Sequence, residues 1–583
     1  MKQRNSLLWA LAALMLTAVL LLPSCQEWKG SGQETGSSTI TLPTDDTGSG
    51  EIEVDTTMNG NKYKHIIYNE KGIRVSFGVV GGQNLFEPNA DIPFWFTIAA
   101  KELNGTEAKV QLTSIGLRFF EEKSVTLSQP DSEQHTYTGS FTAEKNGIYT
   151  MTLILEDDLR FSFRIGVVPK NEKASDIFYF GVQPYICRAY TWGSGYTVKG
   201  QTVDESEASI LNTIEWLGCN LIREDGTVWE TMQPTENSEI NYIWMDRLAD
   251  ATDKRDIVLN WLLQTTPRWA VKEEYLSWTD ENMYWSVCPQ EDKWDAYATA
   301  LANRYAAKDN IFWEIWNEPD WEFFTGTPED YLDLLERTAK IFRAVNPEVH
   351  LYPGGLTVVN DPSDYRYKDS RPYFAGFKKL LDQKLIDTFA IHIHGTFNDT
   401  YFFNTLNAMT QQAEEAGLSM SGIYNTEAGL YSENEDIMAT NLMAKILYSR
   451  GHDYKMYVQY DFRATPSNES NAWAIFDSSL SPRKAAIAYA VLIGKLGQAE
   501  KVATISDSRS LYADLYYDGE QSIVTVFNDG ASLGRLTVPE GIAFEAYDLY
   551  GNPIDFDGTV DASLSAVYLV CDGKISADGF VCE

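Results

Sequence analysis

The stretch Ile311–Asp320, which reads IFWEIWNEPD, constrains this chain more than any other. It begins with apolar and aromatic residues, as a buried strand does, and Pro319 closes it because proline cannot donate a hydrogen bond to a sheet. Glu318 is thereby left at the carboxyl end of a strand, which is the catalytic face of a β/α barrel. Gly422–Glu427 has the same form and places a second glutamate, Glu427, at the end of another strand. Hydrolysis of a glycosidic bond needs such a pair, one acid/base and one nucleophile.

The four residues Trp316–Pro319, which read WNEP, resemble the acid/base signature of clan A glycoside hydrolases, which are retaining (β/α)8-barrel enzymes. The resemblance implies that Glu318 is the acid/base after strand 4 and that Glu427 is the nucleophile at the end of strand 7. Glu433 and Glu435 are alternatives for the nucleophile, but they lie in a polar stretch, whereas Glu427 ends an apolar one. We therefore expect a retaining β-glycosidase that cleaves a β-linked polysaccharide or oligosaccharide.

Asn317 and Arg223 complete the predicted polar pattern of the site. By the same resemblance, Asn317 binds the 2-hydroxyl of the sugar, a contact that strengthens in the transition state. Arg223 ends a predicted strand, where clan members carry an arginine near the nucleophile, and it would keep that carboxylate ionised. The alternatives are a turn-capping role for Asn317 and a structural ion pair of Arg223 with Glu224 or Asp225.

His392 and His394 are separated by one residue, so on a strand both side chains point the same way. Two interpretations compete. A metal pair needs a further ligand, and none is evident near these two among the six histidines of the chain, so we expect no metal and no cofactor. In the clan pattern the pair instead lines the substrate site, although many members have a tyrosine at the position of His394.

Three tryptophans follow predicted barrel strands closely enough to lie near the catalytic rim: Trp229, Trp269 and Trp473. The flat indole of any of them can stack on a sugar ring, and each is about as well explained as a core residue. Trp473 resembles the platform that clan members carry after strand 8, so it is the first candidate for binding substrate.

The pattern of strands and helices predicts a multidomain chain. Residues 65–170 alternate apolar and polar positions and predict a β-sandwich, immunoglobulin-like, with a structural role or a glycan-binding one. Residues 175–497 alternate strands with helices and predict a central (β/α)8 TIM barrel, over nearly the same span as the clan resemblance. Thr327 is expected to cap a helix within it. Residues 498–583 return to a strand pattern and predict a small C-terminal β-sandwich.

Residues 1–25 predict a lipoprotein signal peptide. The apolar run Leu7–Leu22 is shorter than the roughly 20 residues of a spanning helix. Leu22–Cys25, which reads LPSC, resembles the lipobox of bacterial lipoproteins, in which the cysteine is lipidated; a simple secretion signal or a retained membrane helix is the alternative. Residues 26–64 are rich in glycine, serine and threonine and predict a flexible tether. We expect a lipid-anchored protein of the bacterial cell envelope, at the outer membrane on its periplasmic or cell-surface face.

The formal net charge of −36 would repel nucleic acid, so the expected partners are a carbohydrate substrate and, through the lipid, a membrane. Cys571 and Cys582 lie close together in sequence and either form a disulfide or remain thiols. The alternative function is a non-catalytic glycan-binding lipoprotein on a hydrolase-like barrel. The presence of both carboxylates with Asn317 and Arg223 argues against it.

Overall fold

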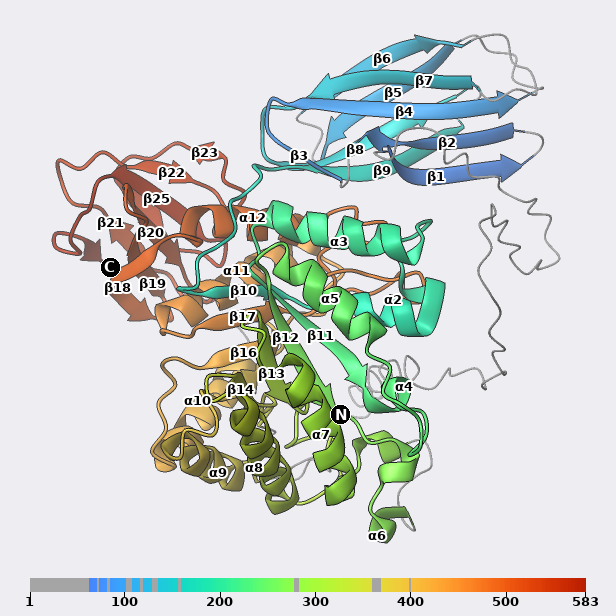
Figure 1. Ribbon diagram of the computed structural model, residues 1–583. Coiled ribbons are helices and arrows are strands. Elements are labelled where there is room, and N and C mark those ends of the chain that lie inside the picture. The colour runs from blue at the N-terminus through green and yellow to red at the C-terminus, as the bar shows by residue number, and fades with distance from the viewer. Residues whose placement is uncertain are drawn as a thin grey trace, which may run out of the picture.

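The protein is described by a computed structural model that covers residues 62–70, 73–80, 84–100, 107–115, 119–127, 135–155, 159–276, 283–358, 369–397 and 400–583. A β region, a barrel and a second β region follow one another along the chain (Figure 1). The predicted signal peptide, its lipobox Cys25 and nearly all of the predicted tether lie outside the described residues.

Eight parallel strands form the barrel, as predicted: β10 (Tyr179–Val182), β11 (Leu221–Val228), β12 (Val258–Gln264), β13 (Ile311–Ile315), β14 (His350–Pro353), β15 (Ala390–His392), β16 (Tyr424–Ala428) and β17 (Met456–Gln459). They lie in the order β14-β13-β12-β11-β10-β17-β16-β15. Leu356, which follows β14, closes the ring because its N–H donates to Ala390 O at 3.1 Å and its carbonyl accepts from His392 N at 2.9 Å. The functional side chains therefore converge at one end of a nearly closed barrel.

Helices between the strands cover the barrel: α2 (Ile186–Trp192), α3 (Val203–Leu217), α4 (Trp229–Met232), α5 (Ile243–Asp253), α6 (Glu273–Leu276), α7 (Glu291–Tyr305), α8 (Pro328–Val345), α9 (Arg371–Asp382), α10 (Thr400–Glu415), α11 (Glu435–Gly451) and α12 (Lys484–Leu496). Thr327 caps α8 as predicted, since its Oγ1 accepts a hydrogen bond from Asp330 N at 3.1 Å. In return, the Thr327 N–H donates to the side chain of Asp330. Within the described ranges, we find no helix with the length and apolar character needed to span a bilayer.

The N-terminal β region consists of two sheets. One has the order β1 (Lys62–Glu70), β2 (Ile73–Val80), β4 (Asp91–Ala100), β7 (His135–Thr142). The other has the order β3 (Leu85–Phe86), β9 (Arg160–Val167), β8 (Gly147–Ile154), β5 (Glu107–Ser114), β6 (Phe120–Thr126). The rings of Phe77 and Phe163 meet between the sheets, with centroids 4.9 Å apart. Strand β1 begins at Lys62, before the predicted boundary at residue 65, and the immunoglobulin-like assignment stays a prediction.

The C-terminal β region is built from a larger and a smaller sheet. The larger has the order β18 (Glu500–Ser508), β19 (Leu511–Tyr517), β20 (Gln521–Phe527), β25 (Val567–Asp572), β22 (Glu545–Tyr547), β23 (Pro553–Ile554). The smaller has the order β24 (Thr559–Asp561), β21 (Arg535–Thr537), β26 (Val581–Cys582). Leu515, Val524 and Leu569 belong to a hydrophobic core formed within this C-terminal region. Cys571 is buried and Cys582 exposed, and both are free thiols.

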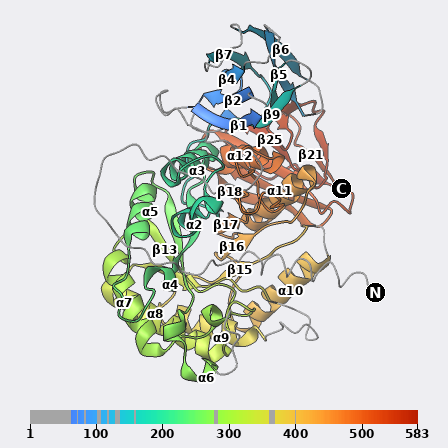
Figure 2. The same cartoon turned by 90° about the vertical axis from the view of Figure 1, so that its right-hand side faces the viewer.

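The two β regions touch each other as well as the barrel, and both views place the N-terminal one beside α3 and α12 (Figure 1, Figure 2). Asn146 N donates to Asn552 Oδ1 at 3.1 Å, and Asn552 Nδ2 donates back to Asn146 O at 3.2 Å. Gly551 makes this approach possible, because its φ is +74° and a Cβ there would lie 3.1 Å from Asn146 Nδ2. These contacts fit the structural role predicted for the N-terminal region.

Candidate active site

Glu318 is placed by a strained turn at the end of β13. The strand ends at Ile315, earlier than predicted, because Trp316 (φ 69°) and Glu318 (φ 40°) both have positive φ values that a strand cannot hold. The close passage of Gly354 supports this turn, since a Cβ on that residue would lie 2.4 Å from Trp316 O. Glu318 is buried in this turn, at 2% exposure.

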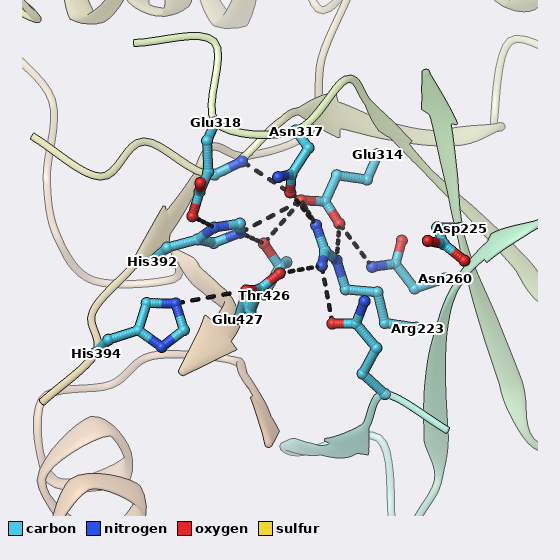
Figure 3. Close-up of polar contacts among 12 residues, drawn as sticks. Arg223, Asp225, Asn260, Glu314, Asn317, Glu318, His392, His394, Thr426 and Glu427 are labelled. Carbon is cyan, nitrogen blue, oxygen red and sulfur yellow. Dashed lines mark hydrogen bonds and ion pairs between the residues drawn. The ribbon is translucent and has the colours of Figure 1, made fainter. Parts of the chain in front are cut away.

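Glu427 lies on β16 opposite Glu318. One carboxyl oxygen from each glutamate, together with a ring nitrogen of His394, lie within 4.8 Å of one another. Glu427 Oε2 accepts a hydrogen bond from Arg223 Nη1 at 2.6 Å (Figure 3). The alternative Glu435 is used elsewhere, because it starts α11 and accepts from Lys484 N at 3.0 Å. The geometry therefore pairs Glu318 with Glu427.

Arg223 makes the contacts expected of a site residue. Its Nη2 donates to Asn317 Oδ1 at 2.8 Å, so Asn317 is held in the site by its side-chain oxygen. The alternative ion pair of Arg223 with Glu224 or Asp225 is not formed. Glu224 accepts from Ile186 N at 2.6 Å instead, and Asp225 pairs with a different arginine of α2.

Glu314 is a buried residue of the site that the sequence analysis did not select. It accepts from Arg223 Nε at 2.7 Å and from Arg223 Nη2 at 3.1 Å, and Asn260 Nδ2 donates to it at 3.0 Å. Its exposure is 0%, and it lies within β13, whereas Glu318 lies on the turn that follows this strand. The available signal was an acidic residue inside an otherwise apolar strand, because such a residue requires a buried partner.

His392 bridges the two halves of the site. Its Nδ1 lies 2.7 Å from Glu318 Oε1, and its Nε2 lies 3.0 Å from the hydroxyl oxygen of Thr426 (Figure 3). Gly355 allows the ring this position, since a Cβ there would lie 2.2 Å from His392 Cδ2. Because both ring nitrogens of His392 are engaged, the arrangement favours the substrate-site interpretation over metal ligation for this histidine.

His394 faces Glu427. Its Nε2 lies 3.5 Å from Glu427 Oε1, and its ring packs edge-to-face on Trp473 with centroids 5.3 Å apart. Trp473 is half-buried and also contacts Tyr431, a residue that is 44% exposed. The structure thus brings Trp473 to the site and adds an exposed aromatic residue, Tyr431, that the sequence analysis did not select.

Trp229 lies in the core, which corrects its prediction as a sugar platform. It is 0% exposed and stacks on Tyr297 at a centroid distance of 4.6 Å, so neither face is open to a ligand. Trp269 packs edge-to-face on Trp229 at 5.1 Å and donates its indole N–H to Gln233 O at 3.2 Å. Trp269 therefore belongs to the same aromatic cluster rather than beside the carboxylates.

The environment drives the pKa values of the two glutamates apart. Burial, the largest influence, raises the pKa of Glu318 to about 7 against the opposing effect of His392, and the Glu427 carboxylate adds to the rise. Burial also acts to raise the pKa of Glu427, but His394 and Arg223 outweigh it and hold that pKa well below its usual range. At neutral pH one carboxyl can carry a proton while the other is ionised, as an acid and a nucleophile require.

Comparison with known proteins decides the family. The family model described as Cellulase (glycosyl hydrolase family 5) matches residues 186–501, more than half of the 583-residue chain. The chain belongs to glycosyl hydrolase family 5. This confirms the resemblance to clan A barrels, and the family 5 chain is a glycosidase that acts on O-glycosyl bonds. No curated protein matches the sequence.

Solved structures share the fold of this family 5 chain. A family 39 glycoside hydrolase from the gut symbiont Bacteroides cellulosilyticus has a TM-score of 0.58 and 18% identity, over 84% of this chain and 99% of that one. A conserved exported protein from Bacteroides fragilis has a TM-score of 0.48 and 12% identity, over 69% and 99%. A family 30 endoxylanase from Clostridium papyrosolvens has a TM-score of 0.44 and 14% identity, over 70% and 99%. The likeness to the family 39 structure supports the fold.

Proposed function

We propose that the protein is a retaining β-glycosidase in which Glu318 is the acid/base and Glu427 the nucleophile. The observation that carries the proposal is the approach of the two carboxyl groups to within 4.8 Å. Retaining glycosidases hold their carboxyl groups about 5–5.5 Å apart, whereas inverting enzymes leave about 6.5–9.5 Å for a water molecule. The opposed pKa shifts of the two groups support the same division of roles.

The reaction proceeds in two displacements. In the first, a Glu427 oxygen attacks the anomeric carbon, the bond to the leaving oxygen breaks, and Glu318 gives that oxygen its proton. The product is a glycosyl ester of Glu427. In the second, Glu318, now a carboxylate, takes a proton from a water molecule whose oxygen attacks the anomeric carbon, and Glu427 leaves as a carboxylate.

The proposed substrate is a β-linked polysaccharide or its oligosaccharides. Trp473 would supply the aromatic face for the sugar whose anomeric carbon is attacked, because it packs on His394 beside Glu427. Asn317 would bind the 2-hydroxyl through its amide nitrogen, since its oxygen already accepts from Arg223. The family membership and the paired carboxylates favour this enzyme over a protein that only binds glycans.

The proposed location is the bacterial cell envelope, with the outer membrane as the anchoring site. The lipobox-like Leu22–Cys25 and the tether-like composition that follows it support a lipid anchor on Cys25. Labelled palmitate should be incorporated into the full chain expressed in a bacterium and not into its Cys25→Ser variant. Equal labelling of the full chain and of the variant would contradict the proposed lipid anchor on Cys25.

A time-course experiment tests the proposed function. Protein lacking residues 1–25 is incubated with a panel of β-linked glycans beside a Glu318→Gln variant, and product length and anomeric configuration are followed by chromatography and proton NMR. A first product with the β configuration of the substrate is expected. An α-configured first product would show an inverting mechanism and overturn the assignment of Glu427 as nucleophile. Binding of one glycan with no product from any would favour the binding protein.

A further inference from the structure

Thr426 immediately precedes Glu427, and its hydroxyl group contacts two buried side chains. Thr426 Oγ1 donates to Glu314 Oε1 at 2.9 Å and lies 3.0 Å from His392 Nε2. All three side chains are at most 2% exposed. Building on the proposed function, we propose that Thr426 is a positioning residue that acts through His392. It directs the acid proton of Glu318 to the carboxyl oxygen that faces the leaving group.

The hydroxyl group of Thr426 has two buried polar neighbours, Glu314 and His392. A hydroxyl group has one hydrogen to donate, and a carboxylate can only accept. Glu314 is ionised, because Arg223 binds it through two hydrogen bonds, and burial is outweighed so that its pKa falls to about 2. The Thr426 hydrogen therefore goes to Glu314. Towards His392 the hydroxyl can then only accept, so His392 Nε2 carries a hydrogen.

The other ring nitrogen of His392, Nδ1, faces Glu318. Its Nδ1 lies 2.7 Å from Glu318 Oε1, and its Nε2 is also 3.7 Å from Glu314 Oε1. A carboxyl group near each nitrogen favours the doubly protonated ring. Burial acts to lower the pKa of His392, but Glu314, Glu318 and Glu427 together raise it to about 9, and of these Glu314 and Glu427 stay ionised when Glu318 carries its proton. His392 Nδ1 thus donates to Glu318 Oε1.

The position of the acid proton follows from these two bonds. Since Oε1 of Glu318 accepts from His392, the proton that Glu318 transfers must be on Oε2, the oxygen left for the substrate. In this state the charges balance: Glu314 and Glu427 are negative, while Arg223 and His392 are positive. If His392 were neutral, with its hydrogen on Nε2, its Nδ1 would accept a hydrogen bond from Glu318 Oε1. The acid proton would then be on Oε1 and would point away from the leaving group.

Two variants of Thr426 distinguish a positioning role of its hydroxyl group from a packing role of its side chain. Thr426→Val keeps the shape of the side chain and removes the hydroxyl, whereas Thr426→Ser keeps the hydroxyl. Thr405→Val is the matched control, because Thr405 is 3% exposed on α10 and its hydroxyl oxygen has no hydrogen-bond partner among the described residues. Each variant is assayed on two β-glycosides with the same sugar, one with a dinitrophenyl leaving group and one with an unactivated sugar as leaving group.

The expected result depends on the leaving group. Dinitrophenolate departs without protonation, so its kcat/KM should fall less than about threefold in Thr426→Val, while the sugar leaving group should lose roughly 10–100-fold. Thr426→Ser should restore most of that loss, and Thr405→Val should match the wild type on both substrates. Equal losses on the two substrates, or no loss on either, would overturn the proposal.

A measurement on the wild-type protein covers the case in which Thr426→Val does not fold. Nitrogen-15 NMR of labelled histidine, assigned with a His392→Gln variant, should show both nitrogens of His392 protonated at pH 6. A bare nitrogen on His392 at that pH would overturn the proposal. A wild-type protein that cleaves no glycoside would count against the proposed function alone, since the NMR signal still reports on the hydrogen bonds of Thr426.

Discussion

Arg223 and Glu314 form a doubly hydrogen-bonded ion pair inside the barrel, and the same guanidinium group reaches Glu427 at 2.6 Å. Arg223 and Glu314 are at most 1% exposed. One cation thus connects the proposed nucleophile to a carboxylate that lies within β13. A buried charge without a partner is costly, so each member of this group depends on the others for stability as well as for its ionisation state.

Replacing Glu314 by Gln should destabilise the protein by about 3–5 kcal/mol, because it leaves the Arg223 charge buried with one partner fewer. The pKa of Glu314 is lowered to about 2, so its contribution is fully present above its ordinary value of 4.5 and is lost as pH falls towards 2. Urea unfolding midpoints from pH 3 to pH 7 should therefore fall more steeply on acidification in the wild type than in Glu314→Gln. The exposed Glu540→Gln is the control, and equal slopes for Glu314→Gln and the wild type would contradict the prediction.

Glu427→Ala should lose roughly 10⁴-fold or more of kcat, because no other group can form the glycosyl ester. Added azide should restore turnover of an activated β-glycoside and give an α-glycosyl azide, seen by NMR. The exposed Glu433→Ala, the alternative from the sequence, should behave as wild type. Loss of activity in Glu433→Ala with near-normal rates in Glu427→Ala would exchange the two assignments.

The pH profile of kcat/KM should fall on its basic side near pH 7, because Glu318 must be protonated to act as the acid and its pKa is about 7. The acidic side should lie below pH 4, since the pKa of Glu427 is held well below its usual range. In Glu318→Gln the residual rate on a dinitrophenyl glycoside should lose the basic limb. A basic limb that stays unchanged in this variant would assign the titration to another group.

The stability of the protein should also report the raised pKa of Glu318. A carboxyl group with a folded pKa of about 7 destabilises the fold as pH rises from about 4.5, and the full cost is present above pH 7. Glu318→Gln should therefore raise Tm relative to the wild type at pH 8 and change it little at pH 4. A Tm difference that is the same at both pH values would show that the side chain does not titrate in this range.

Trp473→Ala should lower activity, whereas Trp229→Ala should lower stability. Trp473 is half-buried beside His394, so its loss should lower kcat/KM by roughly 10-fold or more while Tm changes little. Trp229 is 0% exposed, so its loss should cost about 3–5 kcal/mol of stability and leave KM of the folded protein near normal. Thermal unfolding and steady-state kinetics on both variants distinguish these outcomes, and a rise in KM alone for Trp229→Ala would return it to the binding site.

Much of the architecture could be read from local patterns. The apolar runs of the barrel strands, the Thr327 cap of α8 and the period-two segment of β9 are set by residues near one another in sequence. Trp316–Pro319 and Glu427 were likewise found from motifs that end apolar strands. These features follow from backbone geometry and from which residues a strand or a helix end accepts, so a linear reading suffices for them.

Side-chain partners far apart in the chain were decided only by tertiary packing. Glu314 and Thr426 are 112 positions apart, on strands β13 and β16 that are not neighbours in the sheet, and they meet inside the barrel. Trp229 and Trp473 are the same residue type at similar places after strands, yet one is enclosed by aromatic rings and the other lies beside His394. Burial and the identity of a partner depend on every element that packs around a side chain, and that is a property of the folded chain rather than of any segment.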